Sequence, residues 1–164
     1  ASGQSVDAQL FAGGLLVFDL PGLQQKNGRQ VRVFRNKVFD NNHANFASKG
    51  SIVASVPPGM GLMLMAADEV EVFDNEIRDH QTSGISIFSF EISGKKLKDK
   101  TYDQYPEGIS IHDNKFSNCG YDPKGDVSLL LKPVVGSRFP DILWDGIVNP
   151  KKTKAGEPLS LIHI

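Results

Sequence analysis

An eight-residue pattern occurs three times in the sequence and constrains the fold more than any other feature. The three copies span Val31–Val38, Val70–Ile77 and Ile109–Phe116. Each reads aliphatic, any, aliphatic, any, any, Asn, any, apolar, and the asparagines are evenly spaced, since 75 − 36 = 39 and 114 − 75 = 39. A fixed period of this length indicates a repeat architecture, in which one structural unit recurs along the chain.

A second pattern, a glycine followed by alternating apolar residues, lies between the copies of the first. It occurs at Gly14–Phe18, Gly61–Met65 and Gly84–Phe88. Such short alternation, bounded by glycine and polar residues, is typical of a β-strand. No segment keeps the apolar spacing of an amphipathic helix over several turns, and the 16 glycines and 9 prolines interrupt the chain often. The sequence therefore predicts an all-β fold.

Short strands that recur in one order cannot bury their apolar faces alone, so each unit must stack on the next. The glycine and asparagine patterns together resemble the right-handed parallel β-helix repeat family. The stretch from Gly13 to Gly146 is similar to bacterial parallel β-helix repeat proteins of unassigned activity. The resemblance implies a right-handed parallel β-helix, a solenoid fragment of about three to four coils with a C-terminal cap-like segment. It also implies a larger protein that is secreted or periplasmic.

The repeat suggests how the chain is divided. We expect residues 1–148 to form the β-helix fragment, with coils around 13–38, 59–77 and 84–116. In the cap-like segment, 117–148, an apolar run should cover an end of the core, followed by a strand with a buried tryptophan. Residues 149–158 are rich in lysine and proline and should be a linker or tail. Residues 159–164 resemble the translation of a transposase sequencing adaptor, so we expect a non-native tail there.

Composition excludes several classes of protein. A formal net charge of −1 argues against a nucleic-acid binder, because tracking phosphates requires a basic surplus. No apolar run approaches the length of a membrane span. The single cysteine, Cys119, cannot form an internal disulfide, and we expect it to be a packed residue. The expected partners are a polysaccharide and further coils of the full-length chain.

Stacked copies place equivalent residues in columns. Asn36, Asn75 and Asn114 should form an internal ladder of hydrogen-bonded amides with a structural role. Asp74 and Asp113 should lie one rung apart. They could belong to a salt-bridged column with Arg35, bind calcium as the one cofactor we consider, or form a catalytic carboxylate pair.

Two histidines could take part in acid–base chemistry. A polysaccharide lyase or C5-epimerase needs a base to remove the C5 proton and a cation to stabilise the enolate. His80 and His112 are candidate bases, with Lys95, Lys96 or Arg78 as the cation. The motifs of alginate epimerases and galacturonases are absent, however, and His112 aligns with phenylalanines in the other two copies, which favours a surface role.

Two long insertions, 19–30 and 89–108, leave the same corner of the predicted coil and flank the short turn at 66–69. We expect a cleft whose floor carries Asp68 and Glu69. Tyrosines that stack on sugar rings and cations that bind acidic sugars should line its walls. The candidate wall residues are Arg29, Lys95, Lys96, Tyr102 and Tyr105.

The leading hypothesis is a non-catalytic β-helix domain that presents a carbohydrate- or partner-binding surface. One alternative is a polysaccharide lyase or C5-epimerase acting on acidic polysaccharide. Another is a structural spacer or adhesin segment. Sequence patterns at this level do not separate the three, because one fold can carry many activities.

Overall fold

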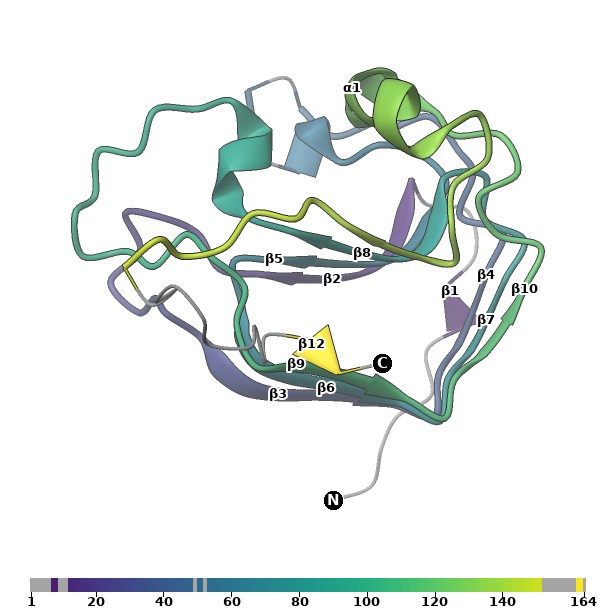
Figure 1. Cartoon of the computed structure of the whole chain (residues 1–164), viewed down its shortest axis with the longest axis horizontal. Coiled ribbons are helices and arrows are strands. Elements are labelled where there is room, and N and C mark those ends of the chain that lie inside the picture. Colours follow the sequence, from purple (N-terminus) through teal and green to yellow (C-terminus); the bar gives the residue numbers. More distant parts are fainter. Residues whose placement is uncertain (1–6, 9–11, 49, 52, 152–161, 164) are drawn as a thin grey trace.

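The computed structural model describes residues 7–8, 12–48, 50–51, 53–151 and 162–163. Its regular structure is mostly β-strand (Figure 1). The strands are β1 (Asp7–Ala8), β2 (Gly13–Phe18), β3 (Arg29–Phe34), β4 (Lys37–Phe39), β5 (Met60–Met65), β6 (Asp68–Phe73), β7 (Glu76–Arg78), β8 (Ser83–Phe88), β9 (Ile109–His112), β10 (Lys115–Ser117), β11 (Ile142–Trp144) and β12 (Ile162–His163). The helical elements are η1 (Val53–Ser55), η2 (Phe90–Ser93) and α1 (Gly125–Val135).

The strands form three four-stranded sheets. Sheet 1 has the order β1-β4-β7-β10, sheet 2 the order β11-β8-β5-β2, and sheet 3 the order β12-β9-β6-β3. Every pairing is parallel. Successive strands belong to different sheets, so each passage of the chain adds one strand to each sheet in turn. The predicted all-β chain with parallel strands is confirmed.

The three sheets enclose the main core. Sheets 2 and 3 face each other across the interior, and sheet 1 closes one side (Figure 1). Repeat positions stand opposite one another, as Val33 does to Val72 and Val72 to Ile111. Inward-facing aliphatic residues of all three sheets form one buried cluster, in which Leu64 and Ile87 are fully buried. Alternation within the strands therefore sends every second side chain into this core.

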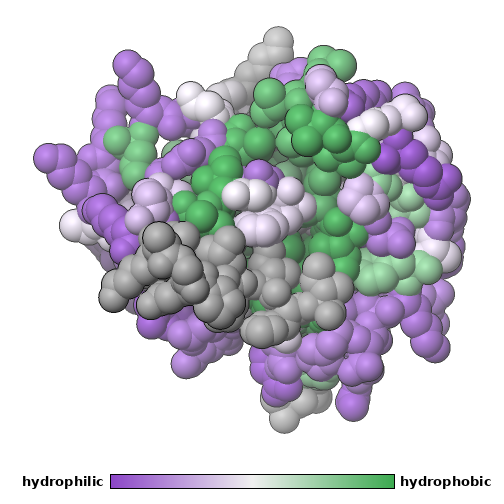
Figure 2. Space-filling view, viewed as in Figure 1, coloured by the Kyte–Doolittle hydropathy of each residue, from purple (hydrophilic) through white to green (hydrophobic). Residues whose placement is uncertain are grey.

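Sheet 2 is also buried on its outer face, and α1 covers part of that face. Met63, Met65 and Phe88 form a second cluster there, against which Val127 and Leu131 of α1 pack. This corrects the prediction that the apolar run covers an end of the core, because α1 lies outside sheet 2 (Figure 1). In the space-filling view, hydrophobic residues gather over α1 and the middle of the face, with hydrophilic residues around them (Figure 2).

The C-terminal part of the chain differs from the prediction at Trp144 and adds one short strand, β12. β11 forms where a strand was predicted, but Leu143 is its buried residue and Trp144 is 36% exposed, so the prediction of a buried tryptophan is wrong. Of the expected linker and tail, 152–161 and 164 lie outside the described residues. The short β12 pairs with β9.

The glycine pattern has a steric cause. Gly14, Gly61 and Gly84 are the second residues of adjacent strands of sheet 2, where side chains of sheet 1 or of the neighbouring corner lie against the backbone. A Cβ on Gly61 would lie 2.5 Å from the carbonyl oxygen of Gly84 and 2.9 Å from the ring of His80. A Cβ on Gly14 would lie 2.8 Å from Nδ2 of Asn41. These contacts are too short for any larger residue.

We therefore expect Gly61→Ala to lower the free energy of unfolding by about 2 kcal/mol or more, because backbone and a buried ring must both shift. Gly28→Ala is the matched control, since its Cβ would meet nothing within 4 Å. Its effect should stay within about 0.5 kcal/mol. Urea unfolding of both variants measures the difference. Equal stabilities would show that sheet 2 tolerates a side chain at this position.

No helix among the described residues is long and apolar enough to cross a membrane.

Candidate functional site

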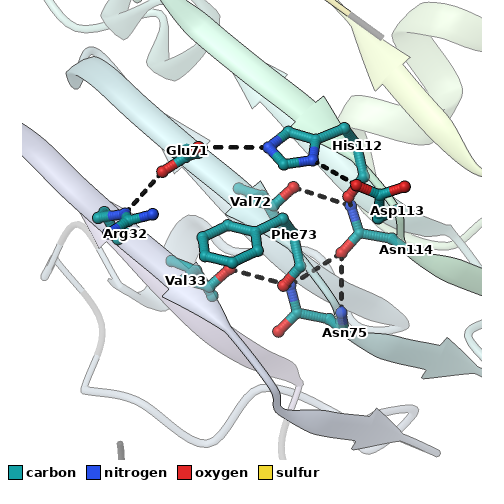
Figure 3. Close-up of polar contacts among 9 residues, drawn as sticks. All are labelled: Arg32, Val33, Glu71, Val72, Phe73, Asn75, His112, Asp113 and Asn114. Carbon is teal, nitrogen blue, oxygen red and sulfur yellow. Dashed lines mark hydrogen bonds and ion pairs between the residues drawn. The ribbon is translucent and has the colours of Figure 1, made fainter.

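The repeated asparagines form a ladder at the corner between sheets 3 and 1. Nδ2 of Asn36 donates to Oδ1 of Asn75 (2.9 Å), and Nδ2 of Asn75 donates to Oδ1 of Asn114 (2.9 Å). The residue before each asparagine has a left-handed backbone, with φ of 55° at Asp74, and this turns the amide inward. Asn75 also donates to the carbonyl of Val33 (Figure 3). The ladder thus caps buried backbone groups at each turn.

A column of stacked rings runs along the outer face of sheet 3. The ring centroids of Phe34 and Phe73 lie 5.1 Å apart, and those of Phe73 and His112 lie 5.3 Å apart, with interplanar angles of 6° in both pairs. Cζ of Arg32 lies 5.0 Å from the centroid of Phe73. Phe73 has a ring stacked on each face, so neither of its faces is free to stack on a sugar.

Charged side chains hold the last ring of this column. Nδ1 of His112 lies 2.8 Å from Oδ2 of Asp113, and Nε2 lies 3.3 Å from Oε1 of Glu71 (Figure 3). Glu71 in turn accepts a hydrogen bond from Nε of Arg32 (2.6 Å). Hydrogen bonds to Asp113 and Glu71 raise the pKa of His112. Both ring nitrogens are occupied and the cation is favoured, so His112 is poorly suited to act as a base.

His80, the other candidate base, is excluded by its position. Its ring is fully buried, and Nε2 lies 3.1 Å from the carbonyl oxygen of Val38. Burial lowers the pKa of His80 to about 4, although the hydrogen bond to Val38 opposes this. A substrate cannot reach the ring, so His80 has no direct role in catalysis.

His80 belongs to a second corner column that the sequence interpretation missed. Asn41, His80 and Cys119 are separated by 39 residues, and each points a polar atom at a backbone carbonyl. Burial raises the pKa of the Cys119 thiol to about 11, so it is inert at neutral pH. The column is structural. The 39-residue spacing is present in the sequence, but it is hard to recognise because the three positions carry different residue types.

Asp74 and Asp113 lie at the surface of the asparagine corner. They line a depression of about 420 Å³. The other residues that line it are Arg35, Asn36, Lys37, Asn75, Glu76 and Lys115. Acidic and basic side chains alternate there. Among the described residues, no group of three or more His, Cys, Asp and Glu side chains is arranged to hold a metal ion.

The predicted cleft is not formed, because the two long loops contact each other. Gly22 donates its backbone N–H to Oδ2 of Asp99 (3.1 Å), and Asn27 donates from Nδ2 to the carbonyl of Thr101 (3.2 Å). Lys26 forms an ion pair with Asp99, which holds the pKa of that carboxyl below its usual range. The loops 19–30 and 89–108 are therefore held together by hydrogen bonds and an ion pair across the short turn at 66–69.

The two tyrosines of the second loop have different environments. Tyr102 is buried, its hydroxyl donates to the carbonyl of Asp19 (2.7 Å), and burial raises its pKa. It is thus a packing residue and not an exposed sugar platform. Tyr105 is half-buried, and its hydroxyl lies 3.2 Å from Oε1 of Glu91.

The remaining predicted wall and floor residues are dispersed. Asp68 accepts a hydrogen bond from the N–H of Glu107 (3.1 Å) within the stacked turn. Arg29 and Glu69 approach to 4.0 Å as an exposed ion pair. Lys95 and Lys96 are exposed further along the second loop. The structure does not gather these residues around one cavity.

A polar pocket of about 610 Å³ lies instead beside the second loop. Its lining combines hydroxyls, amides, carboxylates and ammonium groups with the ring of Tyr105. The lining residues are Asn27, Leu97, Asp99, Lys100, Thr101, Tyr102, Asp103, Gln104, Tyr105, Asn149, Pro150 and Lys151. Only the tyrosines were anticipated, because the pocket depends on segments that come together from three distant parts of the chain. No family model, curated protein or solved structure matches this chain.

Proposed function

We propose that this chain is part of a right-handed parallel β-helix that binds carbohydrate without catalysis, through the pocket beside the second loop. Parallel strands that pass through three sheets in turn, a 39-residue period and an internal asparagine ladder support the architecture. The proposed setting, a secreted or periplasmic protein with further coils, rests on the resemblance of the repeat alone.

The polar pocket carries the functional proposal. Sugars present many hydroxyls, and the pocket offers both donors and acceptors for them, such as Gln104 and Thr101. Tyr105 supplies apolar ring surface of the kind that packs on a pyranose. Lys26 neutralises Asp99, and Lys100 and Lys151 outnumber the second lining carboxylate, Asp103, which leaves a net charge of about +1. This balance favours a uronate-containing polysaccharide over a neutral one.

The arrangement of the histidines supports a non-catalytic role. His80 is buried, and His112 lies outside the pocket with both ring nitrogens engaged. Neither histidine is therefore placed to act as a base on a uronate bound in the pocket.

Affinity electrophoresis tests the proposal. The chain is run through native gels cast with alginate, pectin or dextran, and we expect retardation by the two uronate polymers. Tyr105→Ala should weaken the binding about tenfold, while Tyr105→Phe should keep most of it. Tyr121→Ala is the matched control, because Tyr121 is 39% exposed and does not line the pocket.

Two results would contradict the proposal. If no gel retards the protein, a spacer or adhesin segment becomes the better interpretation. If incubation with alginate or pectin releases unsaturated uronate products, the chain is catalytic.

A further inference from the structure

The helix α1 carries apolar residues on both of its faces. Val127 and Leu131 pack on the outer face of sheet 2. Away from that sheet, Leu129 is 69% exposed, Leu130 62% and Val134 85%. A helix that is apolar all round is normally covered on all sides, and a group of aliphatic side chains with this exposure marks an interaction surface. Hydrophobic residues gather at the position of α1 in the space-filling view (Figure 2).

The further coils of the proposed function would not cover this exposed face. Such coils would add strands to the ends of the three sheets, along the axis on which the strands stack. α1 lies to the side of that stack, outside sheet 2 (Figure 1). The exposed face of α1 is therefore open to a partner from outside the coil.

The two ends of α1 differ in shape and in charge. A hollow of about 290 Å³ adjoins the first turn, and its lining includes the apolar side chain of Met65 and the exposed Asp126. The last turn contains Lys132 and the highly exposed Val134, and Arg138 follows it. The three charged residues form no ion pair with any other residue that the structure describes.

We propose that α1 is a dimerisation surface, on which a second copy of this chain packs with the two α1 helices antiparallel. A two-fold axis brings the same patch of both copies together, so the patch must complement itself. The antiparallel arrangement places the last turn of each helix beside the first turn of the other. Val134 of each copy then lies at the hollow of its partner, and Asp126 lies near the cations that end the partner's helix. Leu129 and Leu130 fill the space between the two helices.

Other occupants match the surface less well. A partner of one charge sign would match only one end of α1, whereas a second copy matches both ends. A lipid surface would accept the apolar side chains, but it would bring the carboxylate of Asp126 against anionic headgroups. Charge complementarity therefore favours a second copy.

Sedimentation equilibrium of the whole chain tests the proposal. The contact is confined to one short helix and its surroundings, so we expect a dimer with a dissociation constant of about 10 μM. Val134→Glu should raise this constant at least about fiftyfold, because it puts a carboxylate into the apolar hollow beside the partner's Asp126. Leu23→Glu is the matched control, since Leu23 is 50% exposed in the 19–30 loop, and it should leave the constant unchanged.

Charge exchange tests the antiparallel arrangement. Asp126→Lys alone, and Lys132→Asp combined with Arg138→Asp alone, should each weaken association at least about tenfold, because like charges then meet at both ends. An equal mixture of these two variants should associate about as tightly as the parent, because opposite charges meet again. A defect in folding of either variant would not be repaired by mixing.

Several results would overturn the proposal. These are a parent chain that stays monomeric up to about 200 μM, open-ended aggregation in place of a dimer, equal effects of Val134→Glu and Leu23→Glu, or no association in the mixture of charge variants. A monomeric parent that floats with phosphatidylserine vesicles would show that lipid, and not a second copy, covers the exposed face of α1.

Discussion

Replacing Asn75 with alanine is expected to lower the free energy of unfolding by about 4 kcal/mol. The side chain is 2% exposed and donates to the carbonyls of Val33 (3.0 Å) and Phe73 (2.9 Å). Its Oδ1 accepts from both the backbone N–H and the amide of Asn36. Removal leaves several buried polar groups without partners, and each costs about 1–3 kcal/mol.

Asn114→Ala provides the graded comparison, because the same contacts are made at a half-buried site. Water can replace part of its hydrogen bonding, so we expect about half the loss. Urea denaturation of the two variants and the parent chain measures both values. A loss below about 1 kcal/mol for Asn75→Ala would show that the ladder contributes little to stability.

The parallel strands and their order could be predicted because the information is local and repeated. Each Val-x-Val segment alternates like a strand, and the 39-residue period sets which segments stand side by side, as Val33 and Val72 do. Once the period is known, the position of Asn75 between two other asparagines follows. No distant contact is needed for this step.

The helix and the loop contacts could not be predicted in the same way. α1 contains Pro133, and its apolar stripe is short, so local signals for it are poor. Its stability comes from packing of Val127 and Leu131 on the outer face of sheet 2, which is a tertiary effect. The burial of Tyr102 depends likewise on the carbonyl of Asp19, 83 residues away in sequence.

The largest pH effect should come from His80. The neutral ring is favoured by burial, which lowers the pKa of His80 from 6.5 to about 4. The carboxylates of Asp79 and Asp40 oppose this shift, and Arg78 adds to it. Because the folded-state pKa is depressed, the chain is most stable above about pH 6.5, where His80 is neutral in both states. As the pH falls toward 4, the unfolded chain takes up the proton first, and about 3 kcal/mol of stability is lost.

His80→Asn isolates this contribution, because Asn41 occupies the equivalent position one rung away and shows that an amide fits the column. Carboxylates whose pKa is lowered by folding, such as those of Glu71 and Asp79, lose stability with acid in both proteins. The Glu71 contribution cancels in the difference between parent and variant, and the Asp79 contribution cancels except for its coulombic coupling to His80, the last of the causes that shift its pKa. Urea unfolding from pH 7.5 to 4 should therefore show the stability of the parent falling relative to the variant by about 3 kcal/mol. If the difference in stability between parent and variant stays constant across this range, the folded chain accepts a proton on His80 as readily as the unfolded chain does. The imidazole would then be hydrated or paired in the folded chain.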